Sequence, residues 1–216
     1  MDSAKIGLIP LLVCGLGIMA IEAAAQYLKA DPILVTAAVR SLDICIILGV
    51  IYIFHRGFHV VGLSIKTAGS GLRQGILWSA GFGALVLLSA GILSLAGIAF
   101  LPLIQVQIPV QPDRLLLFLV VGGIIGPVAE ELVYRGLIYS FLRQWGILIA
   151  LMGSTALFVF SHKVTGGIPI TQIVGGLIFA VAYETSKSLY SPIIIHTLGN
   201  LALFSVGVAN QLMMIR

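Results

Sequence analysis

Residues 115–143 read LLLFLVVGGIIGPVAEELVYRGLIYSFLR, and this stretch decides the fold. Its first half, Leu115 to Val128, contains only apolar side chains, glycine and proline. Its charged side chains all lie in the second half, at Glu130, Glu131, Arg135 and Arg143. A membrane-spanning helix needs roughly 20 mostly apolar residues, and a charge at membrane depth faces a protein interior or a water-filled cavity. The stretch therefore predicts a membrane helix, longer than one simple crossing, whose second half faces other helices.

The composition of the whole chain agrees with a membrane protein. Of its 216 residues, 59% are hydrophobic and 9% are charged, with a mean hydropathy of +1.13; an ordinary soluble domain has roughly 25% charged residues. These values exclude a soluble globular enzyme, a disordered chain and a disulfide-stapled secreted domain. The net charge of +4 comes from scattered single residues, which does not indicate nucleic-acid binding. Cys14 and Cys45 lie inside apolar segments and predict neither a disulfide nor a metal site.

Apolar segments long enough to span or nearly span a bilayer recur along the chain. They are residues 6–26, 33–54, 76–100, 115–143, 147–162, 168–185 and 192–210. These segments predict an all-α polytopic bundle of about seven spans that forms a single membrane domain over residues 1–216. We expect an interfacial loop or short amphipathic helix at 55–75 and a proline-rich connecting loop at 101–113. The first segment faintly resembles a secretory signal, but its length and Glu22 favour a retained helix.

The distribution of lysine and arginine predicts the orientation. With the N-terminus inside, the inner loops hold the larger share of basic residues, namely Lys5, Arg56, Lys66, Arg73, Arg143 and Lys187. The outer side then holds Lys29, Arg114, Lys163 and Arg216. Basic residues concentrate on the cytoplasmic side of membrane proteins, so we expect the N-terminus inside and the C-terminus outside.

Three charged residues in the first two spans favour a structural interpretation. Arg40 and Asp43 are three residues apart on one helix face and can neutralise each other. Glu22 lies near the end of the first span, where we expect its side chain to reach the interface.

The charged residues of the fourth span favour a functional interpretation. Glu131 and Arg135 are four apart and can pair on one helix face, whereas Glu130 points about 100° away and lacks that partner. Glu130 lies 15 residues before Trp145, and His162 lies 16 residues after Gly146. At about 1.5 Å per residue, both are roughly 22–24 Å from the same turn. The two side chains are therefore predicted to meet at one depth, as suits acid–base chemistry.

His196 and Asn200 form a third polar element. They are four apart on one face of the last span. An imidazole and a carboxamide that point at one place can form an oxyanion hole. Taken alone, the pair fits equally well as a source of hydrogen bonds between helices.

Together these residues resemble the motifs of the CAAX protease and bacteriocin-processing (ABI) family of intramembrane proteases. The motifs are Glu130-Glu131-x-x-x-Arg135, Phe158-x-x-x-His162 and His196-x-x-x-Asn200, in the family's order. The resemblance covers about residues 115–205, which would form the catalytic core. It implies a helical bundle with a conical cavity open to one membrane face.

The resemblance also implies roles for these side chains in an intramembrane endopeptidase. Glu130 would act as general base on a water held with His162, while His196 and Asn200 would stabilise the oxyanion. Glu131 and Arg135 would form a supporting pair, and Phe158 would wall the site.

The expected cofactor is none, with zinc as the alternative. Zinc would bind Glu130, His162 and His196. A glutamate-activated water uses all four polar residues, and no HExxH motif is present.

The expected partners are the lipid bilayer and a membrane-anchored protein or peptide, cut near its C-terminus; nucleic acid is not expected. The compact chain favours a prokaryotic inner membrane. The alternatives are a non-catalytic immunity or scaffold protein of the same fold and a small transporter, for which no inverted repeat is visible.

Overall fold

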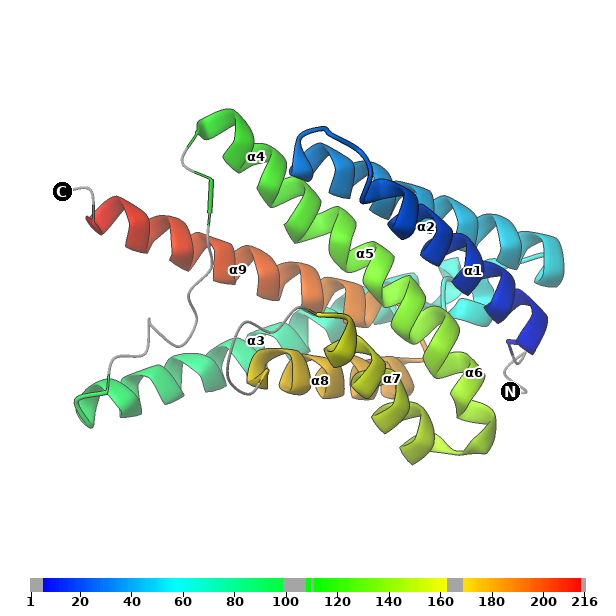
Figure 1. Ribbon diagram of the computed structural model, residues 1–216. Helices are drawn as coiled ribbons and strands as arrows, with labels where there is room; N and C mark the ends of the chain where they lie inside the picture. Colours follow the sequence, from blue (N-terminus) through cyan, green and yellow to red (C-terminus); the bar gives the residue numbers. More distant parts are fainter. Residues whose placement is uncertain (1–5, 99–107, 110, 163–168, 215–216) are drawn as a thin grey trace.

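The computed structural model describes residues 6–98, 108–109, 111–162 and 169–214, and every regular element in these ranges is helical (Figure 1). The first two helices, α1 (Leu8–Ala25) and α2 (Pro32–His55), form an antiparallel hairpin. A 3₁₀ turn (Phe58–Val61) leads into α3 (Ile65–Leu95). The last three helices are α7 (Ile147–Ser161), α8 (Ile170–Ser186) and α9 (Tyr190–Met214).

One continuous helical rod lies between α3 and α7 and contains two π-helical segments. The rod runs from Pro112 to Trp145. Its parts are α4 (Pro112–Val120), the π segment η3 (Val121–Ile125), α5 (Gly126–Glu131), the π segment η4 (Leu132–Tyr139), α6 (Ser140–Leu142) and a final 3₁₀ turn (Arg143–Trp145). Both carboxylates of the first motif therefore lie at the end of α5, directly between the two π segments. Such segments are frequent at functional sites.

The fold confirms the predicted polytopic helical bundle. Within the described residues, five helical stretches are long and apolar enough to cross a membrane, and α7 and α8 are shorter apolar helices. Each predicted span overlaps one of these helices. Large apolar side chains on their outer faces are exposed, such as Leu87 at 75% and Leu148 at 72%. An apolar exterior of this kind suits lipid.

The third helix corrects the prediction for residues 55–75. Only the 3₁₀ turn separates α2 from α3, and α3 already begins at Ile65. The glycines that favoured a loop instead permit close helix packing. A Cβ atom on Gly75 would lie 2.9 Å from the Ser191 carbonyl oxygen of α9, and one on Gly71 would collide with Ser188 Oγ. The predicted loop at 101–113 lies largely outside the described residues, and α4 already begins at Pro112.

The packing of the bundle brings several helices to one place. α5 packs against α2 and α9, and α8 packs against α7 and α9. α7 ends at Ser161, so His162 caps a helix that is too short to cross a bilayer. The beginning of α1 and the end of α9 lie at opposite ends of the bundle (Figure 1).

Candidate active site

A glutamate and two histidines from three helices converge inside the bundle. Glu130 Oε2 of α5 lies 3.7 Å from Nε2 of His162, at the end of α7, and 3.8 Å from Nε2 of His196, in α9. The side chains of Glu130 and His162 are 22% and 29% exposed, and that of His196 is 7% exposed. The structure thus brings Glu130 and His162 together as the depth count predicts and adds His196. Both separations are too long for a direct hydrogen bond and suit a shared bridging molecule.

The partners of the histidines fix which ring nitrogen faces Glu130. His162 Nδ1 lies 2.7 Å from the Phe158 carbonyl oxygen, which can only accept a hydrogen bond. His196 Nδ1 lies 2.8 Å from Glu131 Oε1. Nδ1 therefore carries a proton in both rings, and Nε2 faces Glu130. Partners of this kind set the tautomer and the ring orientation of functional histidines.

Glu131 connects the site to the buried core. Its Oε1 atom accepts hydrogen bonds from His196 Nδ1 and from Arg135 NH1, each at 2.8 Å, and the side chains of Glu131 and Arg135 are fully buried. Arg135 NH2 also donates to the Gly176 carbonyl oxygen of α8 at 2.9 Å. The predicted Glu131–Arg135 pair is present, and its contact with His196 was not predicted.

Asn200 is bound to the helix that carries Glu130. Its Nδ2 atom donates to the carbonyl oxygen of Gly122 at 2.9 Å. Gly122 lies in the π segment η3, and π segments leave backbone groups without their usual helical partner. Because a carboxamide has two N–H groups, one N–H of Asn200 positions the helices and the other is left for a ligand.

Aromatic rings form the apolar wall of the site. Phe158 is 3% exposed, and its ring centroid lies 4.5 Å from that of His162 and 5.9 Å from that of His196. Phe179 stacks on His196 at 4.6 Å, with 19° between the planes. The Arg135 guanidinium lies 4.9 Å from the Phe158 centroid and 5.2 Å from that of Phe179. Phe158 thus lies where the resemblance implies, and Phe179 supports His196 in the same way.

The charged residues of α1 and α2 form one cluster of three. Arg40 NH1 lies 2.8 Å from Glu22 Oε1 and 3.0 Å from Asp43 Oδ2. The pairing of Arg40 with Asp43 is therefore present. Glu22, which we expected near the interface, is 44% exposed, and its carboxylate also pairs with the guanidinium of the next helix. The cluster joins α1 to α2, which in turn packs on α5.

The donor set also bears on the zinc alternative. The Nε2 atoms of His162 and His196 and a carboxylate oxygen of Glu130 are chemically suitable zinc ligands. In their present arrangement, the described residues contain no group of three His, Cys, Asp or Glu side chains placed to hold a metal ion. The residue types fit zinc, and the three donor groups lie close together, with 3.7 and 3.8 Å between Glu130 Oε2 and the two Nε2 atoms.

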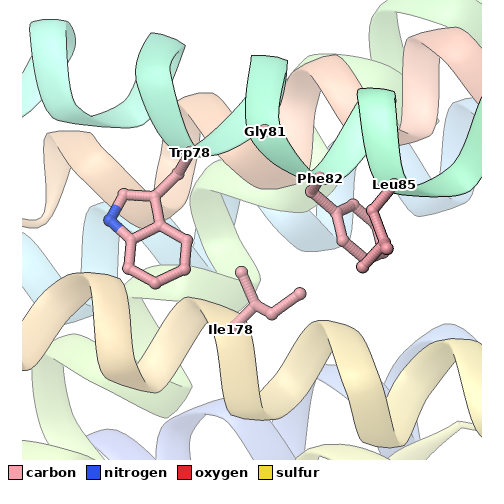
Figure 2. A pocket seen from close by; sticks show the side chains of 5 residues that line it. All are labelled: Trp78, Gly81, Phe82, Leu85 and Ile178. Carbon is pink, nitrogen blue, oxygen red and sulfur yellow. The ribbon is translucent and has the colours of Figure 1, made fainter.

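An apolar groove lies between α3 and α8 (Figure 2). It encloses about 260 Å³. Its lining residues are Trp78, Gly81, Phe82, Leu85 and Ile178. These side chains offer no acid or base.

Sequence reasoning missed several side chains that position the site. Tyr134 and Ser161 are hydrogen-bonded to each other next to His162. Phe179 stacks on His196. The four-residue spacing from Glu130 to Tyr134 is a signal that could have placed Tyr134 near the site. No pattern in the sequence identifies Phe179 or the acceptor carbonyls of Gly122 and Gly176.

Comparisons with known proteins single out the same part of the chain. Residues 112–202 match the family model described as type II CAAX prenyl endopeptidase Rce1-like. The membrane-embedded CAAX protease MroQ of Staphylococcus aureus (strain USA300) is 36% identical over 91 residues, which cover 39% of this chain and 36% of MroQ. The chain thus matches little more than a third of the length of this relative. No solved structure matches the chain significantly.

The matched segment includes every member of the three motifs, from Glu130 to Asn200, and the structure places His162 and His196 of these motifs beside Glu130. The comparisons thereby confirm the resemblance: residues 112–202 of this integral membrane protein match the Rce1-like family of type II CAAX prenyl endopeptidases.

Proposed function

We propose that this protein is a membrane-embedded endopeptidase that uses Glu130 as its general base. The observation that carries the proposal is the position of Glu130 Oε2 between two imidazole Nε2 atoms, at 3.7 and 3.8 Å. A water molecule in this position donates one hydrogen bond to Glu130 and the other to the unprotonated Nε2 of His162. Its oxygen lone pair is then available to attack a peptide carbonyl carbon.

The later steps use the remaining polar groups. Glu130 takes the water proton as the new C–O bond forms, and the carbonyl oxygen becomes an oxyanion. A protonated His196, whose positive charge is balanced by the Glu131 carboxylate, donates from Nε2 to this oxyanion, and the second N–H of Asn200 assists. Glu130 then gives its proton to the leaving nitrogen as the C–N bond breaks. The Glu131 carboxylate thus accepts a hydrogen bond from the His196 ring, as the aspartate does from the histidine in a serine protease triad, but no serine takes part.

The substrate that this arrangement suits is a membrane-anchored protein or peptide. An extended peptide in a bilayer needs polar partners for its backbone, and the half-buried cluster within the bundle offers them. We propose cleavage near the C-terminus of such a substrate, in a prokaryotic inner membrane with the N-terminus of this protein inside. The names of the matching family, a CAAX prenyl endopeptidase, and of MroQ, a membrane-embedded CAAX protease, support the assignment as a protease.

The test compares the purified wild type with Glu130→Gln in liposomes, on a library of membrane-anchored C-terminal peptides. Glu130→Gln keeps the shape of the side chain and removes the base, so cleavage should fall at least about 100-fold. Asp113→Asn is the matched control, because this exposed carboxylate at the start of α4 lies outside the site. Cleavage by Glu130→Gln at the wild-type rate would overturn the proposal.

A chelator arm distinguishes the two mechanisms. Without a metal, cleavage by the wild type should be unchanged after treatment with a strong zinc chelator. Loss of cleavage that added zinc restores would assign Glu130, His162 and His196 as metal ligands. A folded wild type that cleaves none of the peptides would favour the scaffold alternative.

A further inference from the structure

His162 is held by side-chain contacts rather than by regular helix geometry. It follows the last residue of α7 and has an extended backbone, with φ −87° and ψ 129°. Its N–H donates to the Val159 carbonyl oxygen at 3.1 Å in a tightened last turn. The Phe158 carbonyl oxygen is therefore free of a helical partner, as occurs at helix C-termini. It is satisfied instead by Nδ1 of His162 at 2.7 Å and by the Ser161 hydroxyl at 2.8 Å.

Tyr134 completes this arrangement from the neighbouring helix. Its hydroxyl donates to Ser161 Oγ at 2.5 Å, and its ring packs edge-on against Phe158, with the centroids 5.1 Å apart and the planes at 88°. Tyr134 lies four residues after Glu130, in the π segment η4. The Tyr134–Ser161 hydrogen bond thus connects the helix that carries the proposed base to the end of the helix that carries its histidine.

The hydrogen-bonding capacity of Ser161 shows what this contact does. A hydroxyl has one hydrogen and two lone pairs. The Ser161 hydroxyl donates its hydrogen to the Phe158 carbonyl oxygen, which can only accept. One lone pair of Ser161 Oγ accepts the hydrogen bond from the Tyr134 hydroxyl. The remaining lone pair faces His162 Nδ1 at 3.4 Å. Ser161 therefore favours a proton on Nδ1, and this leaves Nε2 unprotonated toward Glu130.

We infer that Tyr134 and Ser161 are positioning residues that hold His162 in the tautomer and place needed to share a ligand with Glu130. This inference rests on the proposed function for its catalytic consequence. Neither residue is part of the three sequence motifs.

The test reads the tautomer and the kinetics separately. In protein labelled with ¹⁵N-histidine, the ring nitrogens of His162 are followed by NMR in wild type, Tyr134→Phe, Ser161→Ala and Ser161→Thr. His162 should be protonated at Nδ1 alone in the wild type and in Ser161→Thr, which keeps the hydroxyl. The Nε2-protonated form should become populated in Tyr134→Phe and in Ser161→Ala. On a cleaved peptide, these two variants should lose roughly tenfold in kcat, the scale seen when groups that orient a functional histidine are removed, with KM within about twofold.

Tyr139→Phe is the matched control. Tyr139 lies on the same helical rod, but its hydroxyl donates to Glu184 at 2.8 Å, away from His162. This variant should keep the wild-type His162 spectrum. A single Nδ1-protonated form in all variants would overturn the inference. The NMR signal needs no turnover, so a protein without protease activity would refute the proposed function while the positioning of His162 would still be measured.

Discussion

At the scale of single residues, Glu131 lies in an environment that is costly for a charged side chain. Its carboxylate is fully buried and is the one anion bonded to the buried Arg135 in the described structure, while it also holds His196. Two charges at such a position stabilise each other only as a pair, because neither is solvated by water.

Replacing Glu131 should therefore cost much more stability than replacing an exposed carboxylate. Glu131→Gln leaves the Arg135 guanidinium buried without a counter-charge and should lower the free energy of unfolding by about 3–5 kcal/mol. Glu22→Gln is the control. The Glu22 side chain is 44% exposed, and Arg40 keeps Asp43 as a partner, so the loss should be about 1 kcal/mol or less. Denaturant unfolding in detergent measures both, and equal stability of the two variants would contradict the argument.

The site illustrates what single residues in a sequence can and cannot predict. Glu130 and His162 could be matched because a short turn joins their antiparallel helices, so counting from that turn gives their depth. Glu131 and His196 are 65 residues apart, and α8 lies between them. No shared turn relates their positions, so their contact could not be counted. The Glu22–Arg40 contact was missed because a side chain near a helix end can turn to the interface or to the neighbouring helix.

At the scale of elements, spacing and composition predict the helices but not their local irregularities. The apolar segments predict all the spans, since a bilayer demands about 20 apolar residues of any crossing helix. The π segments on either side of Glu130 and Glu131 have no such signature, because one extra residue in a turn changes neither composition nor period enough to be recognised. The early start of α3 was missed because glycine favours both loops and tight helix packing.

The packing of α3 on α9 gives a prediction at this scale. A methyl group on Gly75 would meet the Ser191 carbonyl oxygen at 2.9 Å and Ile194 Cβ at 2.8 Å, and neither atom can rotate away. Gly75→Ala should therefore push the helices apart and destabilise the protein by about 1–3 kcal/mol. Gly91→Ala, on the same helix with nothing within 4 Å, should be neutral or slightly stabilising. Thermal unfolding in detergent compares the two, and equal destabilisation would show that the close approach is unimportant.

At the scale of the whole molecule, the charged loops gather at the two ends of the bundle. At one end, Arg114 of α4 pairs with Asp31 between α1 and α2 at 2.9 Å. At the other end, Glu184 of α8 binds Arg143 at 3.1 Å and also pairs with Lys187. The two ends would face opposite sides of the membrane.

The predicted orientation can be tested by labelling cysteines in intact cells. In a background that carries Cys14→Ala and Cys45→Ala, the variants Lys29→Cys and Gln144→Cys place single thiols at exposed positions at opposite ends. With the N-terminus inside, a membrane-impermeant maleimide should label Lys29→Cys directly and Gln144→Cys only after lysis. The reverse pattern would invert the orientation, and labelling of both would show that these positions share one side.

The brevity of α7 has a consequence for the bilayer itself. Its 15 residues rise about 22 Å, whereas the hydrocarbon layer is about 30 Å thick. Along the lipid-facing side of α7, marked by the exposed Leu148 and Phe160, the membrane must thin or adjust to this hydrophobic mismatch. A thinned bilayer brings the aqueous boundary closer to His162 and shortens the path of a hydrolytic water. The rate of the proposed peptide cleavage would then depend on the acyl-chain length of the surrounding lipids.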